Sequence, residues 1–259
     1  MSPSVVLVTG AASGIGLTIA REFAAKGCRV HVCDESRDAI DAMADSDPGI
    51  GTTLCDVSDV RAVDALFDDV AGRFGRLDVL INNAGIAGPT ARVEHIDPDD
   101  WDRTVAVDLS AAFYCARRAI PMLKSSPAGS ILNLLSSAAF FGFPLRAPYA
   151  SCKWGLIGLT KTLAMELGPD GIRVNAICPG SVEGPRIDRV IEADARERGM
   201  TPEEIRRTYL RQSSMRAFVS PRDVAALALF LASADARLIS GQIIGVDGHT
   251  ESLSTWLDE

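Results

Sequence analysis

Apolar residues gather in short, mostly β-branched runs along this chain, and a longer stretch with helical spacing of its apolar positions follows most runs. Most runs lack the alternation of apolar and polar residues seen in half-exposed strands, as expected of parallel strands covered on both faces. The predicted strands are Val5–Val8, Arg29–Cys33, Thr52–Cys55, Val79–Ile81, Ser130–Leu135, Arg173–Cys178 and Gln242–Val246. Strands that alternate with helices form right-handed βαβ units. The pattern predicts an α/β fold: a doubly wound parallel sheet of about seven strands with helices on both faces.

One stretch interrupts this alternation. Between Pro179 and Arg222 no strand is predicted, and two charged helical patterns meet around Gly199-Met200-Thr201-Pro202. Because the stretch follows the carboxyl end of a strand, where open α/β sheets bind ligands, we expect a helical substrate lid at about residues 180–220. An ordinary surface helical hairpin is the alternative. No linker or internal repeat divides the chain, so residues 1–259 are predicted to form one domain.

Charge and hydropathy exclude several classes of partner. The chain has 26 Lys and Arg against 34 Asp and Glu, a formal net charge of −8, so a nucleic-acid-binding surface is not expected. The longest apolar run, Val224–Ala232, is far below the ~20 residues that span a bilayer. Met1–Val8 is too short and too uncharged for a signal peptide. We therefore expect a cytoplasmic protein with no membrane partner.

The cysteines and histidines show no metal-binding spacing. The 6 cysteines include no CxxC pair, and the 3 histidines are scattered. We expect free thiols in a reducing compartment, without disulfides and without a metal site.

The first predicted strand runs directly into a glycine-rich loop, Thr9–Gly16, and then into a helical pattern. Gly10 permits a tight turn, Gly14 lets the backbone approach a pyrophosphate, and Gly16 allows close contact between helix and strand. The free N–H groups of the new helix then face the phosphates, as in Rossmann-type folds. The predicted loop contacts to the nucleotide are Gly10, Ser13, Gly14, Ile15 and Gly16.

The three residues between Gly10 and Gly14 give a spacing that resembles the classical type of the short-chain dehydrogenase/reductase family. The resemblance extends from Val5 to about Gly248, because further family signatures follow in the family's order. These are Asn82-Asn83-Ala84-Gly85 after the fourth strand, Tyr149-Ala150-Ser151-Cys152-Lys153, and Pro179-Gly180 after the sixth strand. The resemblance implies an NAD(P)-dependent oxidoreductase with a small-molecule substrate.

The choice of cofactor depends on the end of the second strand. Asp34 lies 18 residues after Gly16, where a carboxylate bonds the adenosine ribose hydroxyls and repels a 2′-phosphate. The family's NADP-dependent members usually carry a basic residue at the position of Ser13 or just past this strand. Here Glu35 follows Asp34, and Arg37 is the one nearby cation. We therefore expect NAD rather than NADP; the alternative is that Asp34 only caps the following helix.

The resemblance also implies contacts on the adenosine side. In the family, the segment matching Asp56-Val57 contacts the adenine, and the one matching Asn83-Ala84-Gly85 lines the ribose, while Asn82 steadies the sheet. Asp56 also suits a helix cap, and the two roles are compatible.

Tyr149 and Lys153 are four residues apart and therefore share one face of a predicted helix. A phenol ordinarily titrates near pH 10, but a neighbouring ammonium and an oxidised nicotinamide both favour the phenolate. Tyr149 is predicted to exchange a proton with the alcohol or ketone. Ser136 precedes it by the 13 residues found in the family and is predicted to polarise the substrate oxygen, with Ser137 as a turn or capping hydroxyl.

The chain departs from the family pattern in two places. Asp108 replaces an asparagine that helps to hold a water in a proton relay with the active-site lysine. An aspartate still accepts from such a water and attracts Lys153, but it does not donate; alternatively, the local helix bend matters more than the side chain. The threonine expected after Pro179-Gly180, which touches the carboxamide, is also missing. Backbone amides or the region of Val182 are the predicted replacement.

These features predict oxidation of a secondary alcohol, such as a polyol, a sugar-like or a cyclic alcohol, because cellular NAD is mostly oxidised. A 3-oxoacyl-thioester reductase is an alternative. Its acidic carrier protein would bind arginines of the 180–220 insert, although acidic residues lie between these arginines. A catalytically silent nucleotide-binding regulator is another, although Ser136, Tyr149 and Lys153 are all present. A serine hydrolase is excluded because no G-x-S-x-G motif occurs.

Two predicted helices are apolar on a second side. One carries Trp154, Ile157 and Met165, with Gly155 and Gly158 allowing close approach, and the other spans about Trp101–Pro121. Two such helices from each of two subunits form a self-complementary interface, as in many family dimers. The last strand, at a sheet edge, offers a second contact, so we expect a homodimer or a homotetramer. Alternatively, the 180–220 insert covers this second side.

Overall fold

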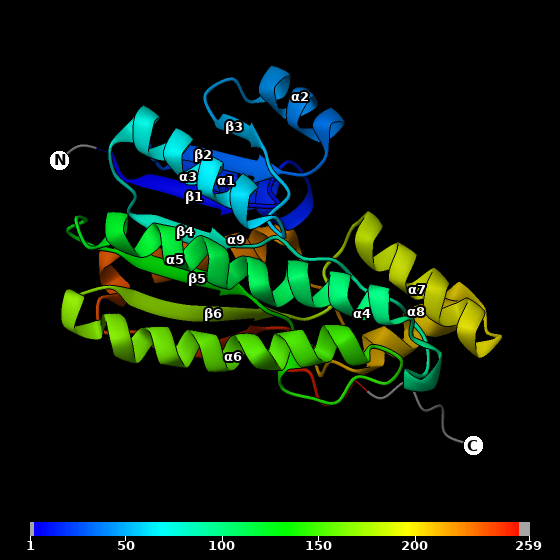
Figure 1. The fold of residues 1–259 in the computed structure, drawn as a ribbon. Coiled ribbons are helices and arrows are strands. Elements are labelled where there is room, and N and C mark those ends of the chain that lie inside the picture. Colours follow the sequence, from blue (N-terminus) through cyan, green and yellow to red (C-terminus); the bar gives the residue numbers. More distant parts are fainter. Residues whose placement is uncertain (1–2, 254–259) are drawn as a thin grey trace.

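Seven parallel strands lie in the order β3-β2-β1-β4-β5-β6-β7 in the computed structural model, which describes residues 3–253 (Figure 1). The strands are β1 (Val5–Thr9), β2 (Arg29–Asp34), β3 (Gly51–Leu54), β4 (Val79–Asn82), β5 (Ser130–Leu134), β6 (Arg173–Pro179) and β7 (Ile243–Val246). Each lies within one residue of its predicted bounds at either end. The predicted fold is confirmed, and β7 lies at the edge of the sheet.

Helices cover both faces of the sheet (Figure 1). They are α1 (Gly14–Ala25), α2 (Arg37–Ser46), α3 (Val60–Phe74), α4 (Pro98–Val105), α5 (Ala111–Leu123), α6 (Ala147–Leu167), α7 (Pro185–Arg198), α8 (Pro202–Arg211) and α9 (Pro221–Ala232). On one face Val6 and Val8 of β1 pack with α1, α2 and α9, and on the other Val5 and Leu7 pack with α3, α5 and α6. This two-sided burial explains why β1 reads as an unbroken apolar run.

The strand order reverses between β1 and β4, which are neighbours in the sheet although β2 and β3 separate them in sequence. The loops that follow these two strands therefore leave the sheet side by side at its carboxyl edge. Such a switch point is where open α/β sheets bind ligands. The glycine loop and the Asn82–Gly85 segment meet there.

The helix predicted around Trp101–Pro121 is interrupted. A π-helical turn, Ala106–Ser110, joins α4 to α5, and α5 continues past Pro121 to Leu123. A π turn holds one more residue than an α-helical turn, so it changes the direction in which the following side chains point.

The charged insert forms α7 and α8, as its two helical patterns predict. Gly199 ends α7 with a φ of +66°, and Thr201 forms a capping box with Glu204 at the start of α8. The pair extends beyond the end of the sheet (Figure 1). Its apolar side chains form a separate cluster with Ala87 and Phe143 of the core domain.

Within residues 3–253, no helix is both long and apolar enough to cross a membrane. All 6 cysteines are free thiols. In the same described part of the chain, no three His, Cys, Asp or Glu side chains gather as metal ligands.

Candidate active site

The glycine loop is packed tightly against the turn that follows β4. A Cβ added at Gly10 would lie 2.7 Å from the Cα of Ala84, and one added at Gly16 would lie 2.5 Å from Nδ2 of Asn83. Gly10 also has a φ of +58°. The Asn83 amide donates to the carbonyl oxygens of Thr9 (2.9 Å) and Gly10 (2.8 Å). Asn83 therefore fixes the loop, in addition to its predicted place beside the adenosine ribose.

The loop and the start of α1 fit a pyrophosphate. Gly14 has a φ of +57°, and a Cβ there would meet no atom within 4 Å among the described residues. No side chain of the described chain caps the N-terminus of α1, where Ser13 is the N-cap residue. The starts of α2, α3 and α4 are capped by Ser36, Asp59 and Asp97. An open glycine at an uncapped helix N-terminus suits an anionic group.

Asp34 reaches from the end of β2 to this loop. Its carboxylate accepts the Ala12 N–H at 3.1 Å and the Ser36 N–H at 3.1 Å. Helix α2 is capped by the Ser36 hydroxyl, which accepts the Ala39 N–H. The structure thus gives the cap to Ser36 and holds the Asp34 carboxylate beside the glycine loop.

Arg103 of α4 links the acids predicted to lie on the adenosine side, and the sequence interpretation missed it. Its guanidinium donates to Glu35 at 2.8 Å and to Asp56 at 3.0 Å. Burial raises the pKa of Asp56, but hydrogen bonds from Ser58 and Arg103 outweigh it and leave that pKa below its ordinary value. Arg103 lies far along the chain from both acids, so no local sequence pattern predicts its contacts with them. The cap of α3 is Asp59, not Asp56.

Tyr149 and Lys153 lie together on α6, with the Lys153 ammonium 5.2 Å from the centre of the Tyr149 ring. Lys153 is buried, and its Nζ lies 3.5 Å from the Leu134 carbonyl oxygen at the end of β5. The same Nζ lies 3.1 Å from Oδ2 of Asp108. The structure therefore brings these three predicted site residues together at the carboxyl edge of the sheet.

The π-helical turn directs Asp108 into this cluster. Oδ1 of Asp108 accepts the Ile86 N–H at 2.7 Å, and a Cβ added at Gly85 would lie 3.4 Å from both Asp108 and Lys153. Burial lowers the pKa of Lys153, but the charge of Asp108, together with Tyr149, outweighs burial and raises the pKa of Lys153 above its ordinary value. Lys153 is thus held as an ammonium.

Ser136 begins the 3₁₀ turn Ser137–Ala139 at the end of β5. Its Oγ accepts the Ala138 N–H at 3.2 Å. Ser137, which we expected to be a turn or capping hydroxyl, is buried within this turn, and the cap is Ser136. Because Ser136 acts here as an acceptor, its hydroxyl hydrogen stays available to a substrate oxygen.

The Pro179–Gly184 segment is held by the chain's C-terminal part. The Gly180 N–H donates to the Val246 carbonyl at 2.9 Å, and a Cβ at Gly180 would lie 3.0 Å from Asp247. Val182 forms a parallel bridge with Val219. Gly180 and Val182 are thereby fixed in the place where the family's carboxamide contact is expected.

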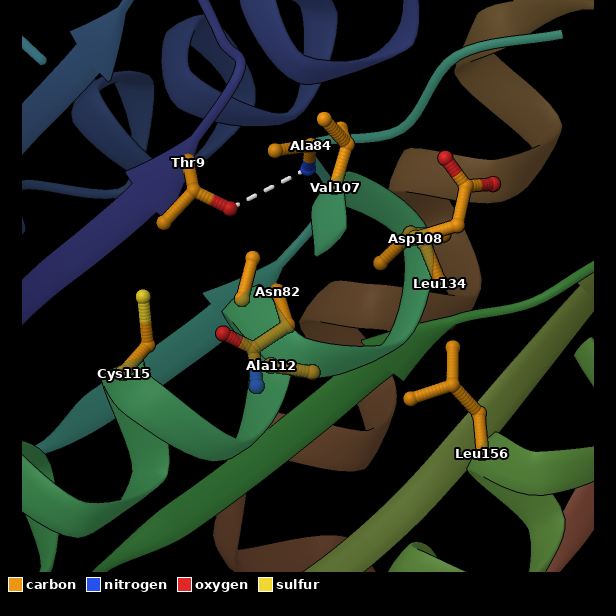
Figure 2. A pocket seen from close by; sticks show the side chains of 10 residues that line it. Thr9, Asn82, Ala84, Val107, Asp108, Ala112, Cys115, Leu134 and Leu156 are labelled. Carbon is orange, nitrogen blue, oxygen red and sulfur yellow. Dashed lines mark hydrogen bonds between the residues drawn. The ribbon is translucent and has the colours of Figure 1, made fainter. Parts of the chain in front are cut away.

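A small cavity of about 10 Å³ lies behind Asp108. Figure 2 shows that the Asp108 carboxylate points away from Cys115 and Leu156, and that the Thr9 hydroxyl accepts the Ala84 N–H. Such a volume holds about one water molecule, so this is a packing cavity and not a nucleotide site. A larger hollow of about 310 Å³ lies at the amino ends of β2 and β3, beside Arg29 and Gly51, on the opposite edge of the sheet.

Comparison with known proteins gives a consistent picture. A family model described as "Enoyl-(Acyl carrier protein) reductase" matches residues 10–249. The chain is similar to D-beta-hydroxybutyrate dehydrogenase of Rhizobium meliloti, with 38% identity covering 93% of this chain and 96% of that protein. It is similar to D-threitol dehydrogenase of Mycolicibacterium smegmatis, with 36% identity covering 94% and 91%.

Solved structures show the same similarity over nearly the whole fold. The structure of NAD⁺-bound xylitol dehydrogenase superimposes with a TM-score of 0.89 at 30% identity, covering 94% of this chain and 97% of that one. The structure of a variant actinorhodin polyketide ketoreductase with NADPH gives a TM-score of 0.90 at 32% identity, covering 95% and 96%.

Proposed function

Because this chain belongs to the short-chain dehydrogenase/reductase family, we propose that it oxidises a secondary alcohol with NAD, and reduces the corresponding ketone, with Tyr149 as general acid and base. The chain is an oxidoreductase acting on CH–OH groups. The observation that carries the finer proposal is the cluster of half-buried Tyr149 with buried Lys153 and Asp108 beside the open glycine loop.

The cluster suits proton transfer at one atom. Tyr149 takes the hydroxyl proton of the alcohol, and Lys153, held as an ammonium, stabilises the phenolate that this requires. Ser136 donates its hydroxyl hydrogen to the same substrate oxygen and orients it. The nicotinamide, when bound, supplies the acceptor for the hydride of the carbinol carbon.

The residues that would hold the dinucleotide lie along the carboxyl edge of the sheet. They are Gly10, Ser13, Gly14, Ile15 and Gly16 at the phosphates, Asp34, Asp56, Val57, Asn83, Ala84 and Gly85 at the adenosine side, and Tyr149, Lys153, Pro179, Gly180 and Val182 at the nicotinamide side. NAD is preferred in this proposal because the Asp34 carboxylate lies at the loop. The similar structures are named with NAD⁺ in one case and with NADPH in another, so the similarity does not favour either cofactor. The proposed preference for NAD therefore rests on Asp34.

A small molecule fits the site better than a carrier-bound thioester. Such a carrier is acidic and needs a basic surface, but two of the arginines of α7 and α8 are paired with acids of the insert. Arg198 bonds Asp194 at 2.5 Å, and Arg206 bonds Asp188. One similar protein, of Thermotoga maritima, is named a 3-oxoacyl-[acyl-carrier-protein] reductase, and the substrate test below includes that class.

Helices α7 and α8 cover the substrate side of the site in this proposal. Their apolar cluster includes Tyr209 and contacts Ala87 and Phe143, which belong to the loops after β4 and β5. The contact is a separate cluster and not part of the main core, so the pair can open without unfolding the sheet.

The proposed assembly is a homodimer or homotetramer in the cytoplasm. Trp154 of α6 and Phe113 of α5 are 52% and 51% exposed, and both helices lie on the same face of the sheet (Figure 1). Large exposed apolar side chains that gather on one face are typical of protein interfaces.

A substrate panel followed through NADH absorbance tests the proposed function. The panel contains polyols, cyclic alcohols, hydroxy acids and a 3-hydroxyacyl thioester, each with NAD and with NADP. In Tyr149→Phe we expect kcat to fall by a factor of about 10²–10⁴, while NADH binding is nearly unchanged, because positioned acid–base groups contribute that much. A Tyr149→Phe enzyme that keeps more than about a tenth of the wild-type kcat would contradict the assignment.

A further inference from the structure

A buried guanidinium lies beside Tyr149 and has no part in the chemistry described above. Arg146 immediately precedes α6 and is 4% exposed. Its Cζ lies 5.2 Å from the centre of the Tyr149 ring and 5.4 Å from that of Phe143. One amino group donates to the Ala87 carbonyl at 2.6 Å. Its Nε is buried and has no hydrogen-bond partner within residues 3–253.

This positive charge also lacks a direct counter-ion. In the part of the chain that the structure describes, no carboxylate lies within the 4.0 Å of an ion pair with Arg146. The charge of Asp194 attracts Arg146 from a greater distance. The carboxylate oxygens of Asp194, however, contact Nε of Arg198 at 2.5 Å and the Tyr209 hydroxyl at 3.5 Å. An arginine stays protonated in proteins, and a buried charge without a partner is costly.

The place of Arg146 in the helix adds to this cost. Arg146 is the N-cap residue of α6, and no side chain among the described residues caps the first turn. A helix N-terminus carries a partial positive charge, which favours an anion and disfavours a cation. Arg186 of α7 adds a second positive charge that acts on both Arg146 and Lys153, and it donates to the Gly85 carbonyl at 2.9 Å.

We propose that Arg146 and the N-terminus of α6 bind the carboxylate of the substrate, so that the enzyme acts on small hydroxy acids and the corresponding oxo acids. This inference rests on the proposed function, because it uses Tyr149 to locate the reacting hydroxyl. A guanidinium forms two parallel bonds with a carboxylate, and the unpartnered Nε supplies one of them.

The geometry limits the size of the acid. Since the guanidinium lies 5.2 Å from the Tyr149 ring, the carboxylate and the reacting carbon belong to the same short molecule. Lys153 does not compete for the carboxylate, because Asp108 already neutralises it.

The test compares hydroxy acids of three to six carbons with their uncharged amides, in the wild type and in Arg146→Met. We expect the wild type to prefer the acid, and Arg146→Met to lose about a hundredfold in kcat/KM for the acid but less than about threefold for the amide. Arg146→Lys restores part of the activity on the acid, because it restores the charge without the planar geometry. The control is Arg189→Gln, which removes an exposed arginine of α7 and leaves both values unchanged.

A second measurement needs no turnover. Butanoate and butanamide are titrated into the NADH complex of each variant, and the fluorescence of bound NADH is followed. Butanoate binds more tightly than butanamide to the wild type, and Arg146→Met abolishes the difference. Equal NADH affinity in both proteins shows that the variant is folded.

The outcomes separate this inference from the proposed function. Turnover of neutral alcohols alone, with no preference for butanoate, overturns the carboxylate site but keeps the oxidoreductase mechanism. Equal losses on acid and amide in Arg146→Met also overturn it, because Arg146 would then only hold the loop at Ala87. Absence of any Tyr149-dependent turnover contradicts the mechanism, and selective binding of butanoate through Arg146 still supports the anion site.

Discussion

Lys153 and Asp108 form a buried ion pair, with 3.1 Å between Nζ and Oδ2. The carboxylate partly cancels the positive field that an ammonium at this place exerts on Tyr149. An asparagine, which the family usually has here, is uncharged and does not reduce that field. In the proposed mechanism Asp108 is therefore a positioning residue that adjusts the charge around the phenol without touching the substrate.

Replacing Asp108 by Asn is expected to change the pH dependence of alcohol oxidation. Without the carboxylate, burial lowers the pKa of Lys153, but at neutral pH the remaining ammonium stabilises the phenolate more strongly. The acid limb of the kcat/KM profile then moves to lower pH. An unshifted limb would show that Asp108 only supports the helix. Both Asp108→Asn and Asp108→Ala leave the Lys153 ammonium buried without its counter-charge, which costs about 3–5 kcal/mol of stability. Asp108→Ala also leaves the Ile86 N–H without its partner.

Asp34 is expected to favour NAD over NADP by at least about tenfold in kcat/KM, since a 2′-phosphate would meet its carboxylate. Asp34→Ala reduces this preference. The matched control is Asp41→Ala, which removes the same charge from an exposed position on α2 and leaves the ratio unchanged. Steady-state kinetics with both nucleotides give the ratios, and equal efficiencies in the wild type reject the role of Asp34.

Light scattering is expected to give a mass of two or four chains, not the 27.5 kDa of one. Trp154→Glu places a charge in the proposed helix interface and reduces the assembly. Leu238, just before β7, is 86% exposed, so Leu238→Glu is expected to convert a tetramer into a dimer. Leu54→Glu, at an exposed apolar position on β3, is the control. A wild-type mass of one chain at micromolar concentration contradicts the interface.

His31 is expected to make the protein less stable as the pH falls from about 6.5 to about 4. It is buried in β2, and burial lowers its pKa to about 4, against an ordinary value of 6.5. The Thr53 hydroxyl donates to Asp69 at 2.9 Å, so His31 donates to Thr53 through Nε2 at 2.8 Å. Its Nδ1, without a partner in residues 3–253, has no acceptor for a second proton.

The sign follows from the proton count. Between these two pH values the unfolded chain binds a proton at His31 that the folded chain does not bind, so about 3 kcal/mol of unfolding free energy is lost across the window. Urea unfolding at several pH values measures the slope. His31→Phe reduces it by one proton, whereas His95→Phe, at an exposed position, does not. Equal slopes in wild type and His31→Phe contradict the prediction.

The sheet could be predicted from sequence because its strands are buried on both faces. All five residues of β1 are buried, as are all seven of β6. In β1 this burial is visible in the sequence as the apolar run Val5–Val8, whereas β6 includes the polar residues Arg173 and Asn175 among its apolar ones. The pairing of Tyr149 with Lys153 was also predictable, because four-residue spacing fixes neighbours on a helix. These are local properties, or properties of a single element.

Contacts between distant elements could not be predicted in the same way. Arg103 meets Glu35 and Asp56 only because α4 crosses the end of the sheet. Gly155 was assigned to the approach of a second subunit, yet a Cβ there would lie 3.1 Å from Leu109 of the same chain, so that part of the prediction was wrong. Gly158 faces open space among the described residues.

The sequence carries one local signal for Arg146. A cation directly before a helix that begins Ala147-Pro148 opposes the helix dipole, and such a local conflict is expected at functional sites.

Two parts of the site, the acids on the adenosine side and the Lys153–Asp108 pair, both depend on the one extra residue in the π-helical turn Ala106–Ser110. Deletion of a single residue here would restore regular α-helical bonding and rotate the preceding helix by about 100° relative to α5. Arg103 would then turn away from Glu35 and Asp56, or Asp108 would turn away from Lys153. An insertion or deletion at this turn would thus disturb the adenosine side and the proton-transfer side in one genetic step, although no residue of either is replaced.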